Sequence, residues 1–128
     1  MRAHPASAAV QEQACRALWF ITGGADAQGD ARKQAAADAG ALPQIVAAMV
    51  AHPASAAVQE QGCRALCHNT AGADAQRDAR AQTAADAGAL PQIVAAMGAH
   101  PDIAGVQKWG QGALGYLQVQ RPPNCSVS

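Results

Sequence analysis

The chain has 128 residues, of which half are apolar, and its nine basic and nine acidic residues give a formal net charge of zero. This length fits one domain, and charges scattered singly leave no basic stripe to neutralise phosphates, which argues against a nucleic-acid partner. The sequence contains no run of about 18 apolar residues and no charged leader followed by an apolar segment, so we expect neither a membrane span nor a secretory signal. We expect a cytoplasmic protein without a cofactor, with the nucleus as a second location.

One phrase of eleven residues, AHPASAAVQEQ, occurs twice, at Ala3–Gln13 and Ala51–Gln61, which sets an offset of 48 positions. At this offset residues 38–49 match residues 86–97 without a mismatch, and an eroded third copy follows from His100. Self-similarity at a fixed period of a few tens of residues is typical of a stacked repeat array. The chain therefore divides into a partial repeat at 1–22, repeats at 23–70 and 71–119, and a flexible tail at 120–128.

Three helices are expected in each complete copy, joined by loops such as GGADAQG at residues 23–29. The first, Asp30–Ala39, consists of strong helix formers and ends at Gly40, where a left-handed residue would stop it. The second, Leu42–Met49, has Pro43 near its N1 position and places its apolar residues at helical spacing. No segment has the alternating pattern of a strand.

The third helix of each copy follows a His-Pro pair, and Ser55 is expected to cap the second example. Glycine inside a helix costs about 1 kcal/mol relative to alanine, so Gly62 and Gly110 indicate close approach of a neighbouring helix. The apolar stripe of this helix comprises Val10, Ala14, Ala17, Leu18 and Ile21; then Val58, Gly62, Ala65, Leu66 and Asn69; and then Val106, Gly110, Ala113, Leu114 and Leu117.

Two phrases carry a family resemblance, Ala87-Gly-Ala-Leu-Pro-Gln-Ile-Val94 and Val58-Gln-Glu-Gln-Gly-Cys-Arg-Ala-Leu66. They resemble the armadillo repeat, and the variant is similar to armadillo units of large protist repeat proteins and leucine-rich-repeat kinases. The match covers nearly all of residues 1–119. It implies an all-α fold, a right-handed superhelix (solenoid) of about two and a half repeats. It also implies a non-enzymatic scaffold that binds another protein or a peptide along a groove lined by the third helices.

The family's peptide-binding members carry an asparagine ladder, with a tryptophan one turn before each asparagine. Here the asparagine positions hold Phe20, His68 and Tyr116, and the tryptophan positions are not tryptophan either, so binding in the nuclear-import manner is not expected. Arginine and aromatic residues nevertheless dominate interface hot spots. The partner-binding face that we expect comprises Gln13, Arg16, Phe20, Gln61, Arg64, His68, Trp109 and Tyr116. In the alternative interpretation, Phe20 and Tyr116 fill gaps between repeats and the arginines are solvated.

The four cysteines are expected to be thiols in a reducing compartment, with Cys15 and Cys63 as small buried apolar side chains that recur with the repeat. Cys15 and Cys63 hold equivalent places on helices that stack about 8 to 10 Å apart, too far for a disulfide. Cys63 and Cys67 share a helix face, but no fourth metal ligand is in sight and His68 points about 100° away from that face. No catalytic constellation stands out from the repeat, so neither a metal site nor an enzyme is expected.

The two ends of the sequence raise further hypotheses. Met1 falls on Met49, so the first third helix lacks its second-helix partner, and solenoids generally need about three units. The chain would then be part of a longer armadillo array, a diverged remnant, or a subunit that self-associates through its incomplete N-terminal repeat. The ending Cys125-Ser-Val-Ser128 has the C-a-a-X form, so a farnesylated, lipid-anchored adaptor is the alternative function. A single lipid without a polybasic patch binds membranes weakly.

Overall fold

The computed structural model describes residues 8–21, 27–71 and 76–119, and this part of the chain contains α-helices and no strand. The expected all-α class is therefore confirmed for these residues. The helices are α1 (Ala8–Ile21), α2 (Ala27–Asp38), α3 (Ala41–Ala51), α4 (Ala56–Thr70), α5 (Arg77–Asp86), α6 (Ala89–Ala99) and α7 (Ala104–Val119). None of them is both long enough and apolar enough to cross a bilayer.

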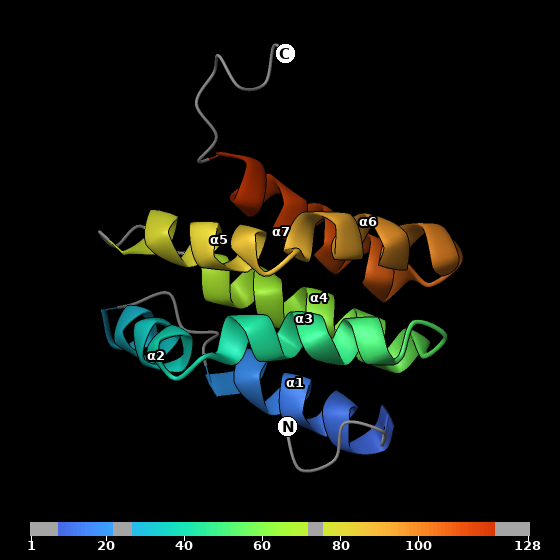
Figure 1. Cartoon of the computed structure of the whole chain (residues 1–128), viewed down its shortest axis with the longest axis horizontal. Helices are drawn as coiled ribbons and strands as arrows, with labels where there is room; N and C mark the ends of the chain where they lie inside the picture. Colours follow the sequence, from blue (N-terminus) through green and yellow to red (C-terminus); the bar gives the residue numbers. More distant parts are fainter. Residues whose placement is uncertain (1–7, 22–26, 72–75, 120–128) are drawn as a thin grey trace.

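Helices α1, α4 and α7 lie side by side and make the most extensive contacts of the fold, with α4 in the middle. Helix α3 packs on α4, and α6 packs on α7 in the same way. Figure 1 shows α1 at the bottom, the α3 and α4 pair above it and the α6 and α7 pair at the top, with α2 and α5 toward one side. The three expected third helices thus form one continuous row.

The helix ends follow the expected local signals. Gly40 and Gly88 have φ angles of 86° and 93°, the left-handed region that favours glycine, and each separates a first helix from a second. Ser55 caps α4, because its Oγ accepts a hydrogen bond from the Val58 amide at 3.2 Å. His52 ends α3, as expected.

Two expected boundaries are shifted. Helix α3 begins at Ala41, one residue before the expected start, so Pro43 is its third residue; proline is tolerated there because the first turn has no intrahelical acceptors for its amides. Helix α2 begins at Ala27, within the segment 23–29 that was expected to be a loop. The run from Ala27 to Asp38 is almost free of breakers, so the helix extends back beyond Asp30.

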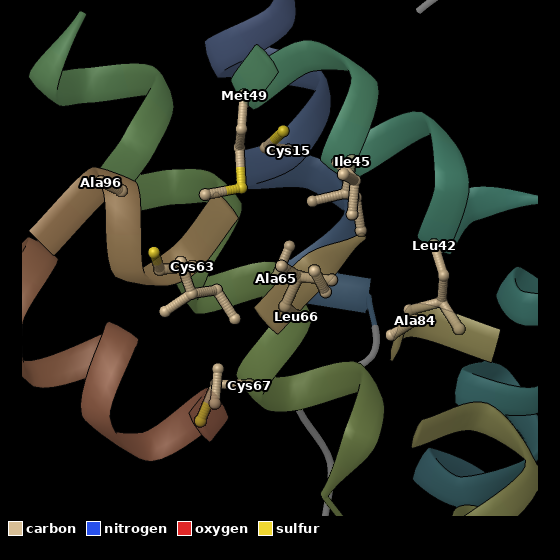
Figure 2. Close-up of a cluster of buried hydrophobic side chains, with 14 of the residues drawn as sticks. Cys15, Leu42, Ile45, Met49, Cys63, Ala65, Leu66, Cys67, Ala84 and Ala96 are labelled. Atoms are coloured by element: carbon tan, nitrogen blue, oxygen red, sulfur yellow. The ribbon is translucent and has the colours of Figure 1, made fainter. Parts of the chain in front are cut away.

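The core lies where α3 and α6 pack on the row of third helices, and Figure 2 shows Met49 of α3 reaching toward the helix of Cys63. Every residue of the expected α4 stripe is buried. A Cβ added at Gly62 would lie 2.6 Å from Met49 Cγ, and one added at Gly110 would lie 2.7 Å from Met97 Sδ. The predicted close approach is therefore confirmed, and the neighbour is the second helix of the same copy.

The repeated Val-Gln pair also has a structural role. Gln59 Nε2 donates hydrogen bonds to the carbonyl oxygens of Met49 at 2.9 Å and His52 at 2.8 Å. Gln107 donates to the equivalent carbonyls at the end of α6, at 2.9 and 3.2 Å. Because the last carbonyls of a helix have no intrahelical donor, this glutamine satisfies them and ties the second helix to the third.

Candidate functional site

A cluster of rings around one arginine lies across the row of third helices. The Arg64 guanidinium carbon is 3.5 Å from the ring centroid of Trp19 on α1 and 4.6 Å from that of Trp109 on α7. Arg64 itself belongs to α4, the middle helix, so its cation lies between indoles from both neighbours. Cation–π contacts of this kind contribute about 0.5 to 2 kcal/mol each, depending on how far they are shielded from water.

His68, one turn after Arg64 on α4, completes this group, which we call the tryptophan cluster (Trp19, Arg64, His68 and Trp109). The imidazole centroid lies 5.9 Å from the Trp19 ring at an interplanar angle of 28°, and 5.3 Å from the Trp109 ring at 43°. Trp19 Nε1 also donates a hydrogen bond to Gln61 Oε1 at 2.5 Å. The cluster therefore joins α1, α4 and α7 through rings, a cation and a hydrogen bond.

Two polar atoms of the cluster have no hydrogen-bond partner in the described part of the chain. Arg64 Nε and His68 Nε2 are shielded from solvent and have no hydrogen-bond partner within the described residues. The ion pairs found in that part of the chain join Lys33 to Asp30 and Arg77 to Asp78, and Arg64 takes part in neither. Burial lowers the pKa of His68, and the charges of Arg64 and Lys33 lower it further, so the imidazole is neutral at pH 7.

The N-terminal half of the predicted face is open to solvent. Phe20 is 76% exposed and meets Trp19 edge-on, with ring centroids 6.0 Å apart. Gln13 and Arg16 on the same helix are exposed as well. The interpretation of Phe20 as a side chain that fills a gap between repeats is therefore wrong. The alternative in which the arginines are solvated holds for Arg16 but not for Arg64.

Tyr116 lies apart from the cluster, at the contact between α5 and α7. The Arg77 guanidinium carbon is 5.5 Å from the Tyr116 ring centroid, and Arg77 Nη2 donates to the Tyr116 carbonyl oxygen at 3.2 Å. Arg77 Nε also donates to the Thr70 carbonyl oxygen at 3.2 Å. Tyr116 is 36% exposed, so its ring packs on Arg77 and still reaches the surface.

Two residues of the site were missed by sequence reasoning, Trp19 and Lys108. The Lys108 Nζ atom lies 4.7 Å from the Trp109 ring centroid and extends the row of cations onto α7. At the 48-residue offset, Trp19 corresponds to Cys67 and Gly115. The candidate face was chosen from the ligand-binding positions of the armadillo repeat, and Trp19 is not at one of them. The available signal was the departure from the repeat: a large ring occupies a place where the other copies hold small residues.

Three cysteines of the described residues are buried in the core beside this face. Cys15, Cys63 and Cys67 are free thiols, and burial raises the pKa of Cys15 and of Cys63 to about 12. Thiols with such pKa values stay protonated at neutral pH and are poor nucleophiles. Among the described residues, no three His, Cys, Asp or Glu side chains gather closely enough to hold a metal ion. Cys125, the candidate prenylation site, lies outside the described residues.

Comparison of the chain with protein-family models, with curated proteins and with solved structures finds no significant match.

Proposed function

We propose that the chain is a non-enzymatic interaction module of the armadillo type, a right-handed superhelix of 48-residue units that binds a partner polypeptide along one face. We call this the third-helix face. It comprises the outward side chains of α1, α4 and α7, namely Gln13, Arg16, Trp19, Phe20, Gln61, Arg64, His68, Lys108 and Trp109. The partner is a protein or peptide, and the module acts as a scaffold.

The observation that supports this proposal is the tryptophan cluster. Trp19, Arg64 and Trp109 are all half-buried, so part of each side chain still faces water after packing. Tryptophan and arginine are the side chains most enriched at the energetic centres of interfaces, where they remain rigid and become fully desolvated on binding. A neighbouring Phe20 that is 76% exposed extends the apolar area beyond the cluster.

The packing of the cluster also favours binding over a purely structural role. Side chains that only fill a core bury their polar atoms against partners, because an unpaired buried donor costs about 1 to 3 kcal/mol. Arg64 Nε and His68 Nε2 lack such partners within the described residues. Core filling alone would not select two such atoms, and the affinity of a partner polypeptide would gain from rings that are already held in place.

A peptide-display selection tests the proposal. The immobilised chain is expected to enrich peptides that bind wild type and lose at least tenfold in affinity against Trp109→Ala or Arg64→Ala, as hot-spot truncations of about 2 kcal/mol imply. Val94→Ser is the matched control, because Val94 is 58% exposed on α6, away from the third-helix face. Circular dichroism establishes that each variant is folded. Failure to enrich any peptide, or binding that is lost in Val94→Ser and kept in both cluster variants, would overturn the proposal.

The alternative is the same module anchored to a membrane by a farnesyl group on Cys125, which requires that Cys125-Ser-Val-Ser128 form the C-terminus of the mature protein. Mass spectrometry of the C-terminal peptide from eukaryotic cells decides between the two forms. A peptide that ends in unmodified Ser128 excludes the lipid-anchored form.

A further inference from the structure

We propose that the edge of the Arg64 guanidinium is a carboxylate-binding point, and that the partner of the third-helix face is an extended acidic segment with side-chain carboxylates about three residues apart. This inference rests on the proposed function, because it names the chemistry of the partner that the face would bind. Its basis is the geometry of the tryptophan cluster and the distribution of charge around it.

The first argument is the orientation of Arg64. Its guanidinium carbon lies 3.5 Å from the Trp19 centroid and 4.6 Å from the Trp109 centroid, so both rings hold the cation by their faces. A planar guanidinium donates hydrogen bonds in its plane. Arg64 Nε is shielded from solvent, but the side chain as a whole is only half-buried, so the two Nη groups are the edge that remains for an acceptor. A carboxylate accepts two parallel N–H bonds from such an edge, which is the strongest match for an arginine held in this way.

The second argument is the charge of the third helices. Their cations are Arg16, Arg64 and Lys108, one on each helix, and their acids are Glu12 and Glu60. The neutral His68 adds no charge of its own at pH 7, because burial and the nearby positive charges lower its pKa. The row therefore presents more positive than negative charge to a partner.

Glu60 is already engaged by the fold. A Cβ added at Gly105 would collide with the Glu60 carboxylate, so this carboxylate lies against the first turn of α7. Negative charge is favourable at a helix N-terminus, where amide groups point outward without intrahelical acceptors. Glu60 is thus placed to stabilise α7, and it leaves the charge of Arg64 for a ligand.

The third argument is the spacing of the cations. Arg16 and Arg64 stand at equivalent positions, 48 residues apart, on helices that pack side by side. Packed helix axes are about 8 to 10 Å apart. An extended peptide rises about 3.3 Å per residue, so a segment that crosses the helices would place carboxylates about three residues apart to meet both guanidinium groups.

The experiment uses the full chain and short amidated peptides in a Gly/Ser/Ala background, with binding followed by calorimetry. One peptide carries two glutamates three positions apart; the others carry two glutamines, two lysines, or two adjacent glutamates. The spaced glutamate peptide is expected to bind about tenfold more tightly than the glutamine peptide, as one charge-assisted hydrogen-bond pair implies. Added salt should weaken its binding.

Substitutions assign the effect to Arg64. Arg64→Gln should remove the preference for glutamate over glutamine, and Arg64→Lys should restore only part of it, because an ammonium cannot bind a carboxylate in the bidentate way. Arg32→Gln is the control, since it removes an equal charge from an exposed position on α2. Arg16→Gln, a change at the exposed second guanidinium, keeps the test decisive if Arg64→Gln fails to fold, and it should reduce the same preference.

The outcomes separate this inference from the proposed function. Equal affinity of the glutamate and glutamine peptides, or tighter binding of the lysine peptide, would overturn the inference and leave the binding face intact. A glutamine peptide with a free C-terminal carboxylate that binds as tightly as the spaced glutamate peptide would also overturn the inference, since the site would then recognise a C-terminal carboxylate and not glutamate side chains. Display selections that yield no peptide dependent on the cluster would instead remove the proposed function.

Discussion

The first eleven residues of α1 and of α4 have nearly the same sequence, but the two helices lie in different surroundings. Val58 of α4 is fully buried, whereas its counterpart Val10 on α1 is 38% exposed. Helix α4 packs against α1 and α7 and is covered by α3, while α1 packs mainly against α4. One sequence therefore supplies core in one copy and surface in the other, and the neighbours decide which. Trp19, His68 and Trp109 of the tryptophan cluster stand where the copies differ, whereas Arg64 matches Arg16.

The largest expected effect comes from truncating the same leucine in both helices. Leu66→Ala should lower the free energy of unfolding by about 3 kcal/mol, because Leu66 is fully buried and the change leaves a cavity. Leu18→Ala should cost about 1 kcal/mol, since Leu18 is only partly buried at the edge of the core. Urea unfolding followed by circular dichroism measures both, and equal losses would contradict the difference between the two helices.

The next effect concerns Asn69, whose side chain is fully buried with neither its nitrogen nor its oxygen hydrogen-bonded to a described residue. The same position holds Leu117 in the third copy, where it belongs to the core. Asn69→Leu should raise the free energy of unfolding by about 2 kcal/mol, because it removes an unsatisfied amide from the interior. The reverse change, Leu117→Asn, should destabilise by at least as much. A destabilising Asn69→Leu would mean that the amide has a partner.

Two glycines give a smaller contrast. Gly62→Ala should lower stability by about 1 kcal/mol net, because its Cβ would lie 2.6 Å from Met49 Cγ and this outweighs the gain in helix propensity. Gly115→Ala should raise stability by up to about 1 kcal/mol, since nothing lies within 4 Å of its Cβ position. Thermal unfolding compares the two variants, and a shift in the same direction for both would contradict the close packing of α3 on α4.

The smallest effect is a pH dependence at His68, which exists in α4 but not in α1. The pKa of His68 lies below 6.5, mainly because the side chain is buried and further because of the charges of Arg64 and Lys33. As the pH falls, the imidazole is therefore protonated in the unfolded state before it is protonated in the folded state. Stability contributed by His68 is therefore present above the unfolded pKa and decreases from about pH 7 toward the lower folded pKa. Unfolding of wild type and His68→Gln measured across this range should differ in slope. Identical slopes would contradict the assignment.

The recurring parts of the fold were predictable from the sequence. Gly40, Ser55 and the α4 stripe act locally or at helical spacing, and such signals depend on the residues themselves. Cys15 and Cys63 were also placed correctly as free, buried thiols, because positions that recur in a repeat tend to serve its packing. Helix order and the buried face of α4 could therefore be predicted without coordinates.

The site could be predicted only in part. Arg64, His68 and Trp109 were expected on one face, but the sequence could not indicate that Trp19 of another copy completes their cluster. Arg80 shows the same limit: it is 1% exposed and donates to the Asn69 carbonyl oxygen at 2.8 Å, whereas its counterpart Arg32 is exposed. Contacts between copies depend on which neighbour is present, and a repeat pattern does not encode that.

The most direct test of the third-helix face is the response of its two indole N–H groups to a bound peptide. Two-dimensional nitrogen–proton NMR spectra of the ¹⁵N-labelled chain are recorded during titration with a display-selected peptide. The Trp19 and Trp109 indole signals should shift together, and both should give the dissociation constant that calorimetry measures for the same peptide. Indole signals that stay fixed while the amide signals around Val94 on α6 move would place the binding site elsewhere and contradict the account.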